Sequence, residues 1–451
     1  MSTQPSKVFP RHCKSSPPVV AGGEGAYITD TSGKQYLDAC GGAAVSCLGH
    51  GNRHVIEAVK QQLDTMAFAH TGFFTSEPAE KLAHMLVERA PENIDRVYFV
   101  SGGSEAVEAS LKLSRQYFLE QGQELRVNII ARRQSYHGNT LGALSAGGNE
   151  WRRRQFQPLL SDAMHHIDAC FEYRDAQAGE SSEAYGQRVA NQLESKILKL
   201  GADTVAAFIA EPVVGATLGA VPAVDGYYRR IREICNQYGV LLILDEVMCG
   251  MGRTGTLFAS EQESIQPDIV CIAKGLGAGV QPIGAMLCTA EIYNTIESGS
   301  GFFQHGHTYL GHPAACAAGV AVLEQIESQQ LLANVSKRGV SIKKAMSERF
   351  GNHPHVGDVR GRGLFMGLEL VSDRQTKQPF DPNLKLHAKF KRCAFENGLM
   401  VYPMGGTVDG LNGDHVLIAP PFIFDDTHCE ELLDKLEITL NRVLTPDVIA
   451  G

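Results

Sequence analysis

A lysine and a carboxylate each directly follow an apolar run of the sequence. Lys274 comes after residues 269–273, and Asp245 comes after residues 240–244. An unpaired buried carboxylate is costly, so Asp245 needs a cationic partner. A lysine in such a place either reaches solvent or takes part in chemistry. The two could form a structural ion pair, or Asp245 could pair with a protonated ring nitrogen of a cofactor whose aldehyde is bound to Lys274.

A short glycine-rich turn is a candidate phosphate site. Gly102, Gly103 and Ser104 follow the apolar run 96–100 and open a helical pattern. Free backbone N–H groups at the positive end of a helix dipole bind phosphate, although Ser104 could equally be an ordinary N-cap. Tyr136 adds an aromatic face. Pyridoxal phosphate needs a phosphate cradle, a Schiff-base lysine, an acid for the pyridine nitrogen and an aromatic ring beside its own, and the sequence offers all four.

These side chains meet only if the runs before them are neighbouring strands. Between about residues 54 and 330, apolar runs alternate with helical patterns such as 105–120, which predicts an α/β domain with a mostly parallel sheet. The unbroken apolar run 240–244 indicates burial on both faces. Ligands of such sheets bind beyond the carboxyl ends of the strands, where Glu211, Asp245 and Lys274 fall. The predicted strands are 96–100, 127–131, 206–210, 240–244, 269–273 and 285–288.

The rest of the chain predicts a smaller α+β unit. Its expected elements are a hairpin at 26–28 and 35–37, helices at 340–350, 384–397 and 430–443, and strands at 365–370 and 416–418. The expected division is an N-terminal segment 1–53 that belongs to the small domain, a large cofactor-binding α/β domain 54–330, and a small C-terminal α+β domain 331–451.

Composition argues against several classes of protein. The formal net charge is -9, which disfavours a nucleic-acid-binding surface, and we assign the run Arg152-Arg153-Arg154 to a solvated face. No stretch approaches the roughly 20 apolar residues that span a bilayer, and the first residues lack a secretory signal. The 11 cysteines include no C-x-x-C pair, so we expect reduced thiols in a cytoplasmic protein and no zinc or other metal site.

The segment from Gly250 to Gly255 matches G-x-G-x-x-G and makes a dinucleotide-dependent dehydrogenase a rival interpretation. The match is weak, because five residues separate the strand from the first glycine and no clear helix begins at Gly255. No acid ends a following strand about 20 residues further on. We interpret the segment as a loop turn.

The chain resembles the class III aminotransferases, the ω-aminotransferase branch of the fold type I pyridoxal-phosphate enzymes, over about residues 25–440. The motifs that carry the resemblance are Ser101-Gly102-Gly103-Ser104-Glu105-Ala106, Tyr136-His137-Gly138, Glu211-Pro212-Val213, Leu244-Asp245-Glu246-Val247, Ala273-Lys274-Gly275, His307-Thr308-Tyr309 and Ala419-Pro420-Pro421. The resemblance implies pyridoxal 5'-phosphate as cofactor, an amino donor and a 2-oxo acid acceptor (pyruvate or 2-oxoglutarate) in a ping-pong reaction, and a homodimer or homotetramer with shared active sites.

The resemblance also implies roles at the cofactor ring. Lys274 carries the cofactor as a Schiff base and moves the proton. Asp245 pairs with the pyridine nitrogen, while Val247 and Tyr136 lie against the two ring faces. His137 belongs to the same cofactor-binding set.

Further roles concern the phosphate and the substrate. Gly103 and Ser104 hold the phosphate, and Thr308 reaches the phosphate bound by the neighbouring subunit. Glu211 lies near the substrate. All of these roles are implied by the resemblance.

One departure from the family pattern bears on the donor. Relatives that act on α-amino acids often carry an arginine two residues before Ala-Pro-Pro, and here that residue is Leu417. The nearby His415 would be a weaker, pH-dependent anion partner, and Glu211 would lose the arginine it pairs with in such relatives. This favours amines or ω-amino acids as donors. Arg153 or Arg360 could serve as the carboxylate clamp, although Arg360 also suits a structural role at a turn.

Other reactions use the same residues. Some class III relatives are lyases or phospho-lyases that act on amino compounds, and others racemise or decarboxylate; the shared residues do not separate these. A non-enzymatic relative is a third reading, and the presence of Lys274, Asp245 and the phosphate turn argues against it.

Overall fold

The structure is a computed structural model that describes residues 6–445, and its largest sheet has seven strands in the order β4-β12-β11-β10-β7-β5-β6. The strands are β4 (Ile94–Val100), β5 (Asn128–Arg132), β6 (Met164–Ile167), β7 (Val205–Ala210), β10 (Leu241–Asp245), β11 (Ile269–Ile272) and β12 (Gly284–Thr289). β12 is antiparallel to both neighbours, and the other adjacent pairs are parallel. The predicted mostly parallel sheet is confirmed.

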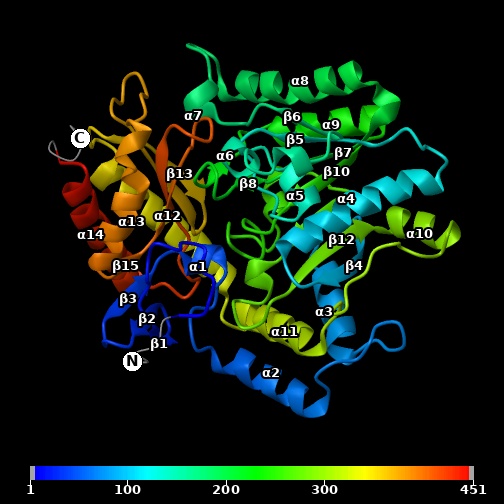
Figure 1. Cartoon of the computed structure of the whole chain (residues 1–451), viewed down its shortest axis with the longest axis horizontal. Coiled ribbons are helices and arrows are strands. Elements are labelled where there is room, and N and C mark those ends of the chain that lie inside the picture. The colour runs from blue at the N-terminus through cyan, green and yellow to red at the C-terminus, as the bar shows by residue number, and fades with distance from the viewer. Residues whose placement is uncertain (1–5, 446–451) are drawn as a thin grey trace.

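Helices cover both faces of this sheet (Figure 1). Side chains alternate along each strand, so Ile243 packs in a cluster with α4 (Gly103–Glu120), while Leu242 and Leu244 pack against α8 (Ser182–Leu200) and α9 (Tyr227–Tyr238). Burial on both faces explains why the 240–244 run carries no polar alternation.

Two four-stranded sheets lie beside the main one. The first has the order β13-β14-β17-β16, with β13 (Val356–Arg362), β14 (Phe365–Leu370), β16 (Tyr402–Gly405) and β17 (Asp414–Ile418). The helices α12 (Leu331–Phe350), α13 (Leu386–Glu396) and α14 (Asp426–Val443) pack on this part of the chain (Figure 1). The second sheet joins β1 (Val20–Glu24), β2 (Tyr27–Asp30) and β3 (Gln35–Asp38) to β15 (Leu399–Met400).

The pairing of β3 with β15 brings the N-terminal segment onto the C-terminal part, with Leu37 opposite Leu399. This contact supports our proposal that residues 1–53 and 331–451 form one small domain beside a large domain of residues 54–330.

The remaining elements connect these layers. They are α1 (Gly41–Ala44), α2 (Arg53–Thr65), α3 (Glu77–Val87), α5 (Leu141–Ala146), α6 (Glu150–Arg153), α7 (Glu172–Asp175), α10 (Ala290–Ser298), α11 (Pro313–Ser328), the short hairpin of β8 (Val213–Val214) and β9 (Val221–Pro222), and the 3-10 turns η1 (Gln157–Leu159), η2 (Ala202–Thr204), η3 (Ala259–Glu263), η4 (Lys274–Leu276) and η5 (Pro382–Leu384). Within residues 6–445, none of the helices combines the length and apolar character needed to cross a membrane.

The G-x-G-x-x-G segment is a turn. Gly252 and Gly255 both have positive φ, of 92° and 104°, and the next helical element is the short η3 rather than an α-helix. A dinucleotide site needs a helix N-terminus at this point. The predicted loop turn is therefore confirmed.

Candidate active site

A cavity of about 450 Å³ opens beyond the carboxyl ends of the central strands. The residues at the carboxyl ends of β4, β7, β10 and β11, and those that directly follow them, line it. The predicted site residues that line it are Gly103, Ser104, Tyr136, His137, Glu211, Asp245, Val247 and Lys274. Thr308 is absent from this lining and lies exposed in the segment between α10 and α11.

Asp245, the last residue of β10, is held by two neighbours. His137 Nδ1 lies 2.8 Å from Asp245 Oδ2, and the backbone N–H of Val247 donates to Oδ1 at 3.0 Å. Asp245 thus pairs with His137 rather than with Lys274, so a Lys274–Asp245 ion pair is not what satisfies the buried carboxylate. His137 is itself buried, and its Nε2 has no partner among the described residues. The carboxylate is fixed in place where it borders the cavity.

Lys274 starts the short turn η4 directly after β11. Its φ is 47°, in the left-handed region that side chains rarely adopt. Burial lowers the pKa of Lys274, and the positive charge of Arg152 acts in the same direction, while Asp245 and Glu211 oppose the shift. A lowered pKa increases the fraction of neutral amine, which is the form that attacks a carbonyl carbon.

The glycine turn before α4 is closely packed. A Cβ on Gly103 would lie 2.6 Å from Val247 Cγ1, and one on Gly138 would lie 2.7 Å from Ser104 Oγ. Gly102 is the N-cap residue, and no side chain caps the helix. Ser104 instead exchanges hydrogen bonds with Asn139, whose N–H donates to its Oγ at 3.1 Å. The first N–H groups of α4 are therefore left available for an anion.

Glu211 fixes the Tyr136 segment. Its Oε1 accepts from the Tyr136 N–H at 3.0 Å and its Oε2 accepts from the Gly215 N–H at 2.9 Å. Burial raises the pKa of Glu211, although the nearby His137 lowers it. Among the described residues no arginine pairs with the Glu211 carboxylate, and both of its oxygens accept backbone hydrogen bonds instead. Its role in this structure is to hold Tyr136 in position.

Comparison with known proteins identifies the family of the chain. The family model described as "Aminotransferase class-III" matches residues 9–440. An uncharacterized aminotransferase of Schizosaccharomyces pombe is 45% identical over 428 residues, which cover 95% of this chain and 93% of the relative. The chain belongs to the class III aminotransferases. It is therefore a pyridoxal-phosphate-dependent enzyme of fold type I, as its resemblance to the family implied.

Solved structures agree with this assignment of the aminotransferase. An (S)-enantioselective ω-transaminase from Thermomicrobium roseum superposes with a TM-score of 0.89 at 37% identity, covering 95% of this chain and 93% of the other. An amine transaminase from an uncultivated Pseudomonas species, solved with pyridoxal phosphate bound, gives a TM-score of 0.90 at 36% identity, covering 98% of both chains. The similarity extends over both the large sheet and the smaller C-terminal part.

The residues present in the aminotransferase fit the cofactor. The glycine turn leaves helix N–H groups free, as a phosphate requires. Asp245 is oriented by His137 and lines the cavity, as an acid for a pyridine nitrogen must, and Lys274 lines the same space. The lowered pKa of Lys274 suits a lysine that bonds to an aldehyde.

The strand that carries Leu417 in the aminotransferase offers no anion site. Leu417 is fully buried in an apolar cluster with Ala44, Val213 and Met248, and Met248 also lines the cavity. The suggestion that His415 could bind an anion is wrong, because both of its ring nitrogens already have partners. Its Nδ1 lies 2.7 Å from Thr407 Oγ1, and its Nε2 lies 3.0 Å from the Ala216 carbonyl oxygen. Burial lowers the pKa of His415 to about 3, so the imidazole is neutral at physiological pH.

The two arginines suggested as clamps are also engaged elsewhere. Arg153 is buried and donates to the carbonyl groups of Leu144 and Gly147. Arg360 is buried, donates to the Gly219 carbonyl at 2.8 Å and forms an ion pair with Glu369. The structural alternative for Arg360 is therefore the correct one, and the assignment of Arg153 to a solvated face is wrong.

Proposed function

We propose that the aminotransferase moves an amino group from a primary amine or an ω-amino acid to pyruvate or 2-oxoglutarate by a ping-pong mechanism. The observation that carries the proposal is the apolar character of this side of the site, where Met248 lines the cavity and belongs to the same buried cluster as Leu417, with no arginine among the described residues that line the cavity. An α-carboxylate placed against Met248 would lack a charge-assisted partner, which costs roughly 1.5–3 kcal/mol.

The names of relatives support this proposal. The Thermomicrobium roseum structure and others of similar shape are described as ω-transaminases. A relative from Solanum lycopersicum is named a gamma-aminobutyrate transaminase and is 35% identical over 436 residues, covering 95% of this chain and 82% of the relative. A gamma-amino acid carries its amino group away from the carboxylate, as the proposed donors do.

The proposed roles at the cofactor follow from the residues that border the cavity. Bound pyridoxal phosphate supplies a carbonyl that takes up the amino group and a ring that accepts the electron pair left when a proton departs. Lys274 would hold the cofactor through its Nζ and then move the substrate proton. Asp245 would keep the ring nitrogen protonated, with His137 fixing the carboxylate. Gly103 and Ser104 would hold the phosphate.

Two further residues would set the plane of the ring. Val247 and Tyr136 both line the cavity, and we propose that they lie against opposite ring faces. The Val247 N–H also bonds to Asp245, and the Tyr136 N–H bonds to Glu211. The positions of both side chains are thereby tied to the acids at the strand ends.

A donor panel tests the proposed function. Holoenzyme would be mixed with simple primary amines, with β-, γ- and δ-amino acids and with common α-amino acids, and with pyruvate or 2-oxoglutarate as acceptor. We expect the first two groups to give a kcat/KM about tenfold to a hundredfold above that of the α-amino acids. Faster reaction of the α-amino acids contradicts the proposed donor class. Ammonia release without consumption of the 2-oxo acid would indicate the lyase alternative.

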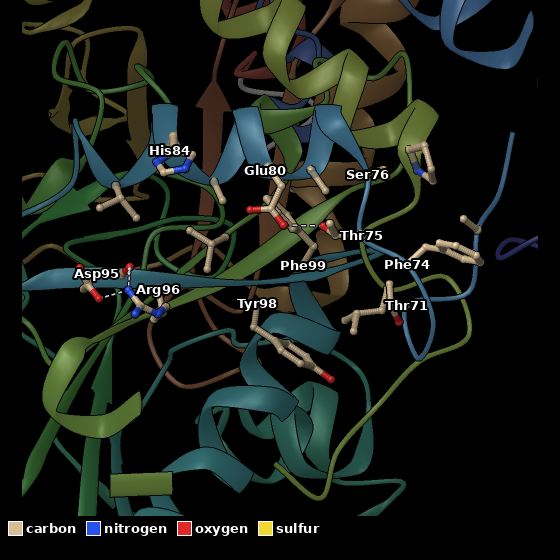
Figure 2. Close-up of a pocket in the computed structure, with 18 residues that line it drawn as sticks. Thr71, Phe74, Thr75, Ser76, Glu80, His84, Asp95, Arg96, Tyr98 and Phe99 are labelled. Atoms are coloured by element: carbon tan, nitrogen blue, oxygen red, sulfur yellow. Dashed lines mark hydrogen bonds and ion pairs between the residues drawn. The ribbon is translucent and has the colours of Figure 1, made fainter. Parts of the chain in front are cut away.

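We further propose that the enzyme is a homodimer or homotetramer with shared active sites. Large apolar side chains are exposed on the segments that flank α3 and α11, where Phe73 is 82% and Phe302 is 66% exposed. Figure 2 shows Phe74 and Thr71 on one of these segments, beside a second cavity of about 500 Å³ between α3 and β4. A partner subunit on this face would bury the apolar groups and could bring its own Thr308 to the phosphate.

A cytoplasmic location is the remaining part of the proposal. All eleven cysteines are free, and most are buried, which is typical of a reducing compartment. Cell fractionation with an antibody to the protein tests this, and recovery in a membrane or secreted fraction contradicts it.

A further inference from the structure

The proposed reaction needs a cation for a carboxylate, because every 2-oxo acid acceptor carries one. The lining of the cavity, as far as the described part of the chain forms it, includes Lys274 but no arginine. Lys274 is reserved for the cofactor, and Arg153 and Arg360 are bonded to carbonyl groups and to Glu369. Within this chain, the candidates for the required cation therefore lie just outside the lining of the cavity.

Arg152 lies next to the cavity. Unlike the guanidinium of Arg153, its guanidinium is not bonded to backbone carbonyl groups of the described residues. Its guanidinium carbon lies 4.5 Å from the ring centre of Tyr136, which does line the cavity. No carboxylate lies within 4.0 Å of its nitrogens in the part of the chain that the structure describes, and its buried Nε has no hydrogen-bond partner there. The side chain is only partly buried, so its terminal nitrogens remain open to a ligand.

The backbone of Arg152 is fixed from the C-terminal part of the chain. Gln134 Nε2 donates to the Gly406 carbonyl at 2.8 Å, and Gln134 Oε1 accepts from Asn149 Nδ2 at 2.8 Å. Asn149 Oδ1 then accepts the N–H of Arg152 at 3.2 Å, as the N-cap of α6. Gln134 and Asn149 are both buried. The chain of bonds holds α6 against residues 406–410 and sets where the arginine side chain begins.

We infer that Arg152 is the specificity-determining residue that binds the carboxylate of the 2-oxo acid, and of an ω-amino acid donor, from beside Tyr136. The inference deepens the proposed function and rests on it. A guanidinium presents two parallel N–H donors to a carboxylate, and the cation–π contact with Tyr136 keeps the group beside the cavity. A simple amine donor has no carboxylate and makes no use of this residue. The same arginine thus serves the acceptor while tolerating uncharged donors.

The experiment uses holoenzyme and glutarate, an unreactive dicarboxylate, as the binding probe in titration calorimetry. We expect Arg152→Gln to weaken glutarate about tenfold to a hundredfold and to raise the KM for 2-oxoglutarate similarly, with kcat less affected. Arg152→Lys should recover part of the loss, since it keeps the charge without the planar fork. The half-reaction with a simple primary amine should stay within about twofold.

Arg154→Gln is the matched control, because Arg154 is an exposed member of the same basic run. It should leave glutarate binding unchanged. The inference is overturned if Arg152→Gln binds glutarate like the unmodified protein, or if it loses the cofactor instead, which would assign the arginine to the phosphate. Glutarate binding does not require turnover. A protein that binds glutarate through Arg152 yet transfers no amino group would therefore refute the proposed function and leave this inference standing.

Discussion

The carboxyl edge of the main sheet and strand β17 of the small sheet both carry buried polar residues, yet only the first lines the cavity, and the hydrogen bonding of the two differs. At the sheet edge, and within residues 6–445, Lys274 borders the cavity without an ion pair and Asp245 is bonded to the side chain of His137 alone. On β17, His415 has both ring nitrogens engaged inside the protein and Leu417 is surrounded by apolar groups. Polar groups with unused bonding capacity beside a cavity mark the reactive side, while satisfied groups mark the supporting side.

The strongest test of this comparison removes the unpaired lysine. Lys274→Ala should lower kcat by at least about a thousandfold, because it deletes both the cofactor attachment and the proton-moving group. The visible absorbance of bound pyridoxal phosphate should also shift. Lys199→Ala, on the exposed side of α8, is the control and should change neither property. Unchanged turnover in Lys274→Ala would show that the sheet edge carrying Lys274 is not the reactive side.

A second test compares two residues of the reactive side. Opposite charges about 4 Å apart are worth roughly 4 kcal/mol at an effective dielectric of 20, which is about a thousandfold in rate. Stacking by Tyr136 contributes on the order of 1 kcal/mol, or about fivefold. We therefore expect Asp245→Asn to reduce kcat far more than Tyr136→Leu. Steady-state kinetics of both variants decide the point, and equal losses contradict the ranking.

The sequence predicted the central strands of the main sheet better than its edge, for a physical reason. A strand buried on both faces has a local signature, so β10 and β11 and the residues after them were found from short apolar runs. β6 was missed because Met164 and Ile167 flank two histidines, which break the apolar pattern at the sheet edge. The different surroundings of Arg152 and Arg153 depend on contacts with Tyr136 and with distant carbonyl groups, which a basic run cannot reveal.

Acid sensitivity tests the supporting side. The pKa of His415 is lowered to about 3, from 6.5, by burial. Between these values the unfolded chain binds a proton that the folded chain does not, so stability present above about pH 6.5 is lost as the pH falls. At about pH 5 the loss is about 2 kcal/mol from this residue. His415→Asn should shrink the difference in unfolding midpoint between neutral pH and pH 5, and an unchanged difference would mean that His415 titrates normally.

The smallest expected effect concerns Thr308. In a single chain this residue lies neither at the sheet edge with Lys274 nor on β17. It is exposed and outside the cavity lining, so a contribution to cofactor binding requires a partner subunit. The hydroxyl would share the charged phosphate with the N–H groups of α4, so we expect its loss to cost about 1 kcal/mol, which predicts a cofactor affinity about fivefold weaker in Thr308→Val. Sedimentation should show the same oligomer for both proteins, since the hydroxyl is too small a part of an interface to control assembly. Thr308→Ser keeps the hydroxyl and should retain the cofactor normally. A monomeric, fully active holoenzyme, or equal retention by the valine and serine variants, would remove Thr308 from the proposed site.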